Sequence, residues 1–138
     1  MKKLTQTRPD NCWQTCVAML LGCASDELPA QQDYPGDRQV YANVLRAYLH
    51  RHHNISYVEV DESRFDEVRR PGLRHLMIGA TERTSPDHDF HHAIVGVGGV
   101  PFWDVFPSRV GLIKTEKWGL LVPIPAGWRD QSVDCVCP

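Results

Sequence analysis

The pattern of apolar and polar residues predicts two amphipathic helices in the first half of the chain. Apolar side chains recur at helical spacing over Asn11–Leu21, where Asp10 or Asn11 can cap the first N–H groups and Gly22 can end the helix. A second helix is expected over Arg38–His52. Its expected apolar stripe consists of Val40, Val44, Leu45, Tyr48 and Leu49. Each helix therefore has one face to bury against another layer of the fold.

The second half of the chain alternates short apolar runs with turn residues, which is typical of β-strands. Strands are expected at Ile55–Val60, Leu76–Ile78, His91–Val97, Val100–Phe106 and Trp118–Ile124. A short helix is expected over Phe65–Arg70, and Gly98-Gly99 joins the third and fourth strands as a hairpin. Because helices come first and an antiparallel sheet follows, the order of elements predicts an α+β fold.

Length and charge narrow the class of protein. The 138 residues suit one domain with a single core, over residues 1–138, in which 126–138 form a tail that can be irregular. The net charge is -2 and the basic residues are scattered, so neither a nucleic-acid nor a membrane partner is expected. The longest apolar run, Cys16–Leu21, is too short to span a bilayer, and Met1–Gln6 lacks the apolar stretch of a secretory signal. The expected compartment is the cytoplasm.

The cysteine count indicates at least one free thiol. The five cysteines are Cys12, Cys16, Cys23, Cys135 and Cys137. An odd number leaves one unpaired in any disulfide framework, and thiols stay reduced in the cytoplasm. The Cys-x-Cys spacing near the end of the chain does not match a zinc knuckle.

Cys12 is the candidate nucleophile. It lies in the first turn of the predicted helix, where N–H groups and the helix dipole favour an anion. A thiolate at such a position is stabilised and is a better nucleophile at neutral pH. Cys16 lies one turn later on the apolar stripe, where we expect it to pack as a small hydrophobe. Because a cysteine at a helix start is often inert, a role for Cys12 depends on partners elsewhere in the sequence.

The hairpin supplies candidate partners. The segment "DHDFHHAIVGVGG" contains His88, His91 and His92, and "FWDVFPS" contains Asp104 on the following strand. A cysteine nucleophile needs a base, and the base needs a third group that holds the imidazole. Since a hairpin brings side chains of its two strands together, a histidine and Asp104 can meet at low cost.

The register of the hairpin decides which histidine meets Asp104. If Gly98-Gly99 is a two-residue turn in a regular ladder, Asp104 shares a face with His91. A three-residue connection through Val100, or a bulge, puts Asp104 on the face of His92 instead. Pro101 lacks an N–H group and disturbs a regular ladder, so a bulge is plausible there. Both histidines stay open on this reasoning.

The order of these residues resembles the papain-like cysteine peptidases. Gln6, Cys12-Trp13, His92-Ala93 and Asp104 stand in the order of that superfamily. The small size and the Cys12-x3-Cys16 pair look more like its bacteriocin-leader peptidase branch, which also has aspartate as third member. "NCWQTCVAMLLG" with "HHAIVGVGGVPFWDVFPSRVGL" is also similar to small uncharacterised bacterial and phage proteins. The resemblance spans roughly residues 6–111.

The resemblance implies a cysteine-bearing helix packed on an antiparallel sheet that carries the histidine. It implies amide, isopeptide or thioester chemistry through an acyl-enzyme on Cys12, with a peptide or protein substrate and no cofactor. His92 would be the base, with His91 as the alternative, and Asp104 would orient it. The Gln6 amide, six residues before Cys12, could stabilise the oxyanion together with the Cys12 N–H. Hydrolysis, deamidation and acyl transfer all fit these residues.

Two other readings compete with this one. The first is a zinc site, because His and Asp side chains crowd one loop and strand. The candidate ligands are Asp87, His88, Asp89, His91 and His92. Neighbours on a strand diverge, however, and no helical His-x3-His fixes a geometry, so no metal is expected. The second is a binding or inhibitor protein on a papain-like scaffold without turnover.

Overall fold

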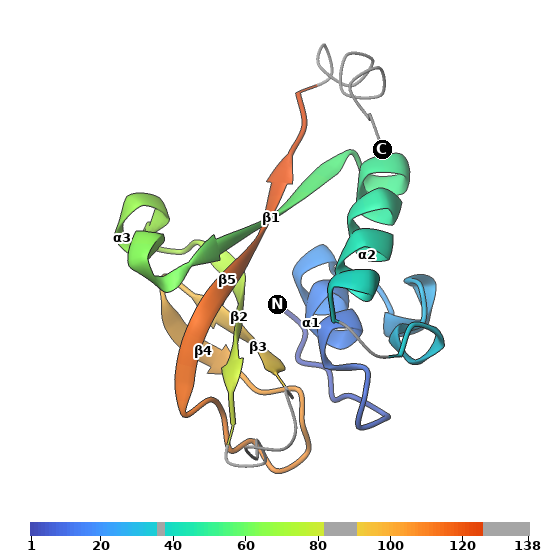
Figure 1. The fold of residues 1–138 in the computed structure, drawn as a ribbon, viewed down its shortest axis with the longest axis horizontal. Coiled ribbons are helices and arrows are strands. Elements are labelled where there is room, and N and C mark those ends of the chain that lie inside the picture. Colours follow the sequence, from blue (N-terminus) through green and yellow to red (C-terminus); the bar gives the residue numbers. More distant parts are fainter. Residues whose placement is uncertain (36–37, 82–90, 126–138) are drawn as a thin grey trace.

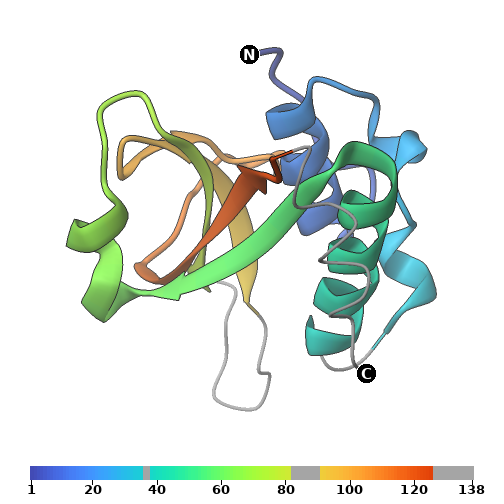
Figure 2. The same cartoon turned by 90° about the horizontal axis from the view of Figure 1, so that it is seen from above.

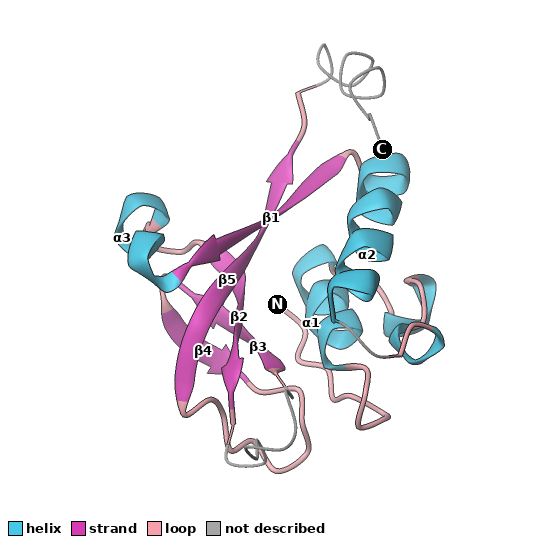
Figure 3. Ribbon diagram, viewed as in Figure 1, coloured by secondary structure: helices cyan, strands magenta, loops and turns pink. Residues whose placement is uncertain are grey.

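The computed structural model describes residues 1–35, 38–81 and 91–125. These residues form helices beside a five-stranded antiparallel sheet (Figure 1, Figure 3). The predicted α+β class is confirmed. Within the described residues, no helix is both long and apolar enough to cross a membrane.

The two longer helices are α1, Cys12–Leu21, and α2, Arg38–His53. Both lie on the same side of the sheet, as the two perpendicular views agree (Figure 1, Figure 2). The C-terminus of α1 is as predicted: Gly22 adopts the left-handed conformation with φ 74°, and its N–H bonds to the Met19 carbonyl at 3.2 Å. The short helix α3, Phe65–Val68, ends two residues earlier than predicted.

The buried face of α2 differs from the predicted stripe. Val40 is 46% exposed, whereas Tyr41 and Ala42 are buried together with the predicted Leu45 and Leu49. The apolar face is therefore turned by about one residue at the start of the helix. The reason is that Tyr41 stacks on Trp13 of α1 and donates its hydroxyl to the Pro29 carbonyl at 2.8 Å.

The cap of α1 also differs from prediction, because neither Asp10 nor Asn11 caps it. Asn11 occupies the N-cap position, but its Oδ1 accepts from the Arg8 backbone N–H at 3.2 Å and makes no bond to the helix. The side chain of Asp10 pairs with Arg8 at the surface. Instead, Gln31 Oε1 accepts hydrogen bonds from the first-turn N–H groups of Trp13 and Gln14. Gln31 belongs to a short 3₁₀ helix over Gln31–Asp33.

The five strands are all antiparallel to their neighbours, in the order β1-β5-β2-β3-β4. Their bounds are β1 Ile55–Asp61, β2 Arg74–Ala80, β3 His92–Val97, β4 Val100–Trp103 and β5 Lys114–Pro123. Strand β5 lies inside the sheet, between β1 and β2, and begins four residues before the predicted Trp118. Its polar start, Lys114–Lys117, gave no apolar signal in the sequence.

A bulge in the β3–β4 hairpin settles the register. Val97 pairs with Val100 and Gly96 with Pro101, but Val95 pairs with Trp103, which leaves Phe102 as the extra residue. The bulge follows Pro101 directly, where the sequence suggested one. Beyond the bulge, residues on the β4 side are shifted by one position relative to β3. Asp104, which follows Trp103, therefore lies on the same face as His92 and not on that of His91.

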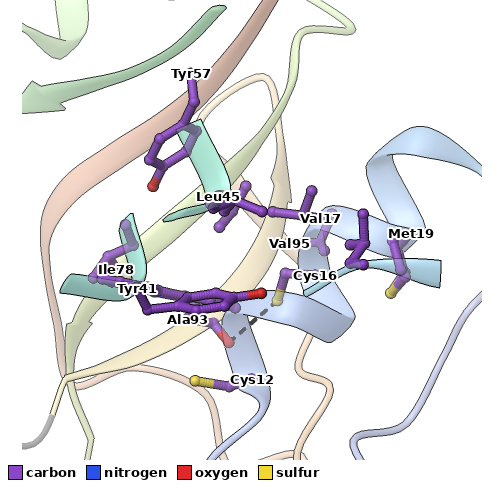
Figure 4. Packing of buried hydrophobic residues seen from close by; sticks show 14 of the residues in the cluster. Cys12, Cys16, Val17, Met19, Tyr41, Leu45, Tyr57, Ile78, Ala93 and Val95 are labelled. Carbon is purple, nitrogen blue, oxygen red and sulfur yellow. Dashed lines mark hydrogen bonds between the residues drawn. The ribbon is translucent and has the colours of Figure 1, made fainter. Parts of the chain in front are cut away.

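The main core lies between the helices and the sheet. Helix α1 packs on β3 and β2, and α2 packs on β1. Fully buried members of this core are Cys16, Val17, Ala18, Leu45, Leu49, Leu76, Ile78, Ala93, Val95 and Val105 (Figure 4). A smaller cluster of Met77, Ile94 and Trp118 packs with Phe65 and Val68 of α3. The alternation along β3 therefore gives both faces of the sheet an apolar layer.

His75 of β2 fixes the turn of the β3–β4 hairpin. Its buried ring stacks on Trp118, with centroids 4.1 Å apart, and Nε2 accepts from the Gly99 N–H at 3.0 Å. Because Nε2 is the acceptor, Nδ1 carries the hydrogen and donates to the Leu76 carbonyl at 3.1 Å. Burial lowers the pKa of His75 from its ordinary 6.5, the Leu76 bond opposes this, and the Arg69 cation adds to the lowering.

We expect His75 to make the protein less stable in mild acid. The unfolded chain takes up this proton near pH 6.5, whereas the folded protein takes it up only at lower pH, so the free energy of unfolding falls as the pH drops below 6.5. One proton sets a limit of about 1.4 kcal/mol per pH unit. Denaturant titrations of wild type and His75→Phe between pH 5 and 6.5 measure the slope. His75→Phe should flatten it and the exposed His53→Phe should not; equal slopes in all three proteins would contradict this.

Candidate catalytic site

A buried imidazole–carboxylate pair lies where β3 begins and β4 ends. His92 Nε2 and Asp104 Oδ1 are 2.6 Å apart, and their side chains are 1% and 6% exposed. A contact this short between buried polar groups is a charge-assisted hydrogen bond. The hairpin therefore brings together the two residues that the His92 alternative requires.

Backbone amides hold the Asp104 carboxylate in place. Oδ1 also accepts from the Phe106 N–H at 2.9 Å, and Oδ2 accepts from the Gly111 N–H at 2.8 Å. Burial raises the pKa of Asp104, but the bonds from His92, Phe106 and Gly111 outweigh it and lower the pKa below its ordinary value. Asp104 is therefore an anion at neutral pH with a fixed orientation.

Arg109, which the sequence reasoning missed, secures the loop that follows Asp104. It has φ 57°, and its guanidinium donates to the Asp104 carbonyl at 2.9 Å and lies 4.1 Å from the Trp103 ring centroid. It also donates to Thr5 Oγ1 in the N-terminal segment. No sequence pattern predicts an arginine in the left-handed backbone conformation after a strand. The contacts of Arg109 with the Asp104 loop are therefore visible only in the structure.

Cys12 lies at the start of α1 beside the imidazole. It is 3% exposed, and its interaction with His92 is one of those that raise the pKa of the imidazole. Burial alone would lower the pKa of His92, but the hydrogen bond to Asp104, followed by the interactions with Cys12, raises it to about 9. Nε2 is bound to Asp104, and the other buried ring nitrogen, Nδ1, has no hydrogen-bond partner among the described residues. Nδ1 is thus available for proton exchange with a thiol.

Cys16 lies in the core, as expected from its position one turn later. It is fully buried, and its thiol donates to the Ala93 carbonyl at 3.4 Å (Figure 4). Burial, and then the neighbouring Cys12 and Asp104, raise the pKa of this thiol well above its ordinary value. Cys16 therefore stays protonated. The described residues Cys12, Cys16 and Cys23 are free thiols, whereas Cys135 and Cys137 lie outside the described residues.

Gln6 reaches the same region because the N-terminal segment runs beside the residue after Asp104. The Gln6 N–H donates to the Val105 carbonyl at 2.8 Å, and the side chain is 4% exposed. Its Nε2 donates to the Arg8 carbonyl at 2.6 Å, while the buried Oε1 has no hydrogen-bond partner in the part of the chain that the structure describes. One of the two Nε2 hydrogens is therefore occupied, which leaves at most one for another acceptor.

His91, the alternative base, has a different partner. Its Nε2 lies 2.7 Å from Glu116 Oε2 on β5. Asp104 thus orients His92 alone of the two histidines.

The zinc reading finds no support in the part of the chain that the structure describes. Asp87, His88 and Asp89 lie outside it. Of the remaining candidates, His91 pairs with Glu116 and His92 with Asp104. Among the described residues, no group of three or more His, Cys, Asp or Glu side chains is arranged to hold a metal ion.

Tyr41 and Gln31 both contact the first turn of α1 or its cysteine, and neither was predicted from the sequence as a site residue. Burial, followed by the effect of Cys12, raises the pKa of the Tyr41 phenol, so its ring is a neutral neighbour of the thiol (Figure 4). The four-residue spacing of Tyr41 and Leu45 could have indicated that Tyr41 lies on the buried face of α2. Gln31 lies 18 residues from Trp13, from whose N–H it accepts a hydrogen bond, and no local motif indicates such a contact.

No protein-family model matches the chain, and no curated protein or solved structure is significantly similar to it.

Proposed function

We propose that the chain is a papain-like cysteine hydrolase that acts on an amide, isopeptide or thioester bond of a peptide or protein. The observation that carries this is the buried His92–Asp104 bond of 2.6 Å beside Cys12 at the start of α1. A thiol at a helix N-terminus, a base that exchanges its proton and an anion that orients the base are the groups that acyl transfer to sulfur requires.

Each residue then has one role in the reaction. The Cys12 thiolate attacks the carbonyl carbon, a C–S bond forms, and the carbonyl electron pair moves to oxygen. Collapse of this intermediate breaks the bond to the leaving group, which takes a proton from His92 Nδ1. Water then attacks the thioester carbonyl as His92 accepts a proton from it. Collapse of this second intermediate breaks the C–S bond, releases the acid and regenerates the Cys12 thiolate beside the protonated His92. Asp104 keeps Nε2 occupied, so that Nδ1 faces the reaction.

The oxyanion would lie between two donors. The Cys12 N–H belongs to the first turn of α1 and has no acceptor within the helix. The free Nε2 hydrogen of Gln6 is the second donor, held near the site by the bond between its backbone N–H and the Val105 carbonyl. We expect a cytoplasmic location, because a free thiol nucleophile persists where thiols stay reduced.

The proposal predicts selective reaction at Cys12. At pH 6.5, iodoacetamide should alkylate Cys12 at least about tenfold faster than the partly exposed Cys23, because His92 beside Cys12 can take the thiol proton and the N-terminus of α1 favours an anion. Incubation with an activated acyl thioester should leave an acyl group on Cys12, found by mass spectrometry of the intact protein and its peptides. Cys12→Ala should lose the adduct and Cys23→Ser should keep it.

The outcomes separate the related activities. Transfer of the acyl group to an added amine in preference to water would indicate an acyltransferase, and ammonia release from a glutamine peptide would indicate a deamidase. If Cys12 reacts no faster than Cys23 and no adduct forms, the enzyme proposal is wrong and a silent binding or inhibitor protein remains.

A further inference from the structure

Gln31 closes the N-terminus of α1 from outside the helix. Its Oε1 accepts from the Trp13 N–H at 3.0 Å and from the Gln14 N–H at 3.2 Å. In return, Gln14 Oε1 accepts from the Gln31 N–H at 2.9 Å, and Gln14 Nε2 donates to the Ser25 carbonyl at 2.8 Å. This exchange of side-chain bonds ties residues 25–31 to the turn that carries Cys12.

The chemistry of this cap is unusual for a helix start. Ser, Thr, Asp and Asn are the usual capping residues, and acidic side chains in the first turn stabilise the positive end of a helix. The first turn of α1 contains no acidic residue, and its cap is a neutral amide. The two N–H groups are thus satisfied without placing a negative charge at the helix end.

We propose that Gln31 is a positioning residue for Cys12: it fixes the first turn of α1 with a neutral acceptor and leaves the positive end of the helix to the Cys12 thiolate. This inference rests on the proposed function, in which Cys12 is the nucleophile. It adds that the charge of the capping side chain sets the pH range over which Cys12 reacts.

Among the described residues, three titratable groups on the elements packed around Cys12 interact with its thiol. They are His92 on β3, the Tyr41 phenol on α2 and the Cys16 thiol on α1 itself. Of these, the imidazolium of His92 favours the thiolate, while the phenol and the second thiol are neutral. A carboxylate at position 31 would place a negative charge directly on the N–H groups of the helix end that carries Cys12.

The test replaces Gln31 with an acceptor of nearly the same shape that carries a charge. In Gln31→Glu, the carboxylate can keep both bonds to the helix, so thermal stability should be equal to wild type or higher. The pH of half-maximal iodoacetamide labelling at Cys12 should rise by about one unit, which lowers the rate at pH 6.5 about tenfold. Labelling is followed by peptide mass spectrometry from pH 5 to 9.

Gln32→Glu is the matched control, because it adds the same charge on the neighbouring residue of the same 3₁₀ helix, Gln31–Asp33. Its profile should stay within about twofold of wild type at every pH, as a screened surface charge has little effect. If Gln31 only stabilised the helix, a more stable Gln31→Glu variant would not label more slowly at Cys12. Higher stability together with slower labelling therefore supports a positioning role.

If Gln31→Glu does not fold, Gln31→Met tests the same contact by removing the acceptor. In the folded variant, labelling of Cys12 should slow at least about threefold across the pH range because the first turn is no longer held.

Each failure has its own meaning. A wild-type Cys12 that reacts no faster than Cys23 overturns the proposed function. A reactive wild-type Cys12 whose profile is the same in Gln31→Glu and Gln32→Glu, or an unchanged rate in folded Gln31→Met, overturns the role of Gln31 alone.

Discussion

Replacing His92 with glutamine will slow the alkylation of Cys12 at pH 6.5 by about 100-fold or more. Without the imidazole, Cys12 is a buried thiol with no base to take its proton, while glutamine can still bond to Asp104. Iodoacetamide labelling of wild type and His92→Gln, quantified by peptide mass spectrometry, measures the change. Acyl-adduct formation on Cys12 should be lost in parallel.

His91→Gln is the matched control, since it removes the neighbouring histidine, whose partner is Glu116. Its labelling rate should stay within about threefold of wild type. A larger loss in His91→Gln than in His92→Gln would make His91 the base and contradict the assignment from the hairpin register.

The raised pKa of His92 adds a pH dependence to the same experiment. Because that pKa is about 9, the imidazolium persists through neutral pH, and its ability to protonate a leaving group is lost only as the pH rises through about 9. The rate of acyl-enzyme formation from an amide by the wild-type protein should fall in that range, and a rate that stays level from about pH 8 to 10 would contradict this.

Gly79→Ala will destabilise the protein by about 3 kcal/mol or more, or about 10 °C in the thermal midpoint. A Cβ at Gly79 would overlap the Lys114 carbonyl oxygen and lie 3.1 Å from Thr115 Cα, so the clash is with backbone that cannot rotate away. The register between β2 and β5 shifts at this point, where the strands approach closely. Thermal unfolding monitored by circular dichroism measures the loss.

Gly72→Ala provides the comparison, because Gly72 has φ 77° and nothing within 4 Å of the added methyl group. Only backbone strain of about 1 kcal/mol is expected there. Gly79 pairs with His92 on its other side, so Gly79→Ala should also reduce labelling of Cys12 in whatever fraction remains folded. Equal losses of stability in the two variants would show that the contact with Lys114 is not tight.

The sequence predicts well what depends on local spacing. The separation of Cys12 from Cys16 followed from helical periodicity and from Gly22 as a terminator. Because strand faces alternate strictly, the choice between two histidines depended only on the hairpin register, which a longer connection or a bulge near Pro101 would shift by one residue. These features depend on short-range geometry that residue types dictate.

What the sequence does not predict depends on contacts between distant segments. Gln31 caps α1 across 18 residues, and Arg109 joins the Asp104 loop to Thr5 near the other end of the chain. The inward position of β5 depends on which strands pair, and its polar first residues carry no apolar period. Only the packed structure decides between such partners, since many side chains of the same type compete for each contact.

The position of β5 also determines when the site can form during synthesis. The part of the sheet that carries His92 and Asp104 joins β1 only through β5, which extends to Pro123. During synthesis, helix α1 with Cys12 leaves the ribosome first. More than half of the sequence must follow before both His92 and Asp104 are present. If Cys12 is the proposed nucleophile, its thiol can meet His92 and Asp104 only after the chain has been synthesised beyond residue 104, so a shorter chain would carry a thiol without its proposed base.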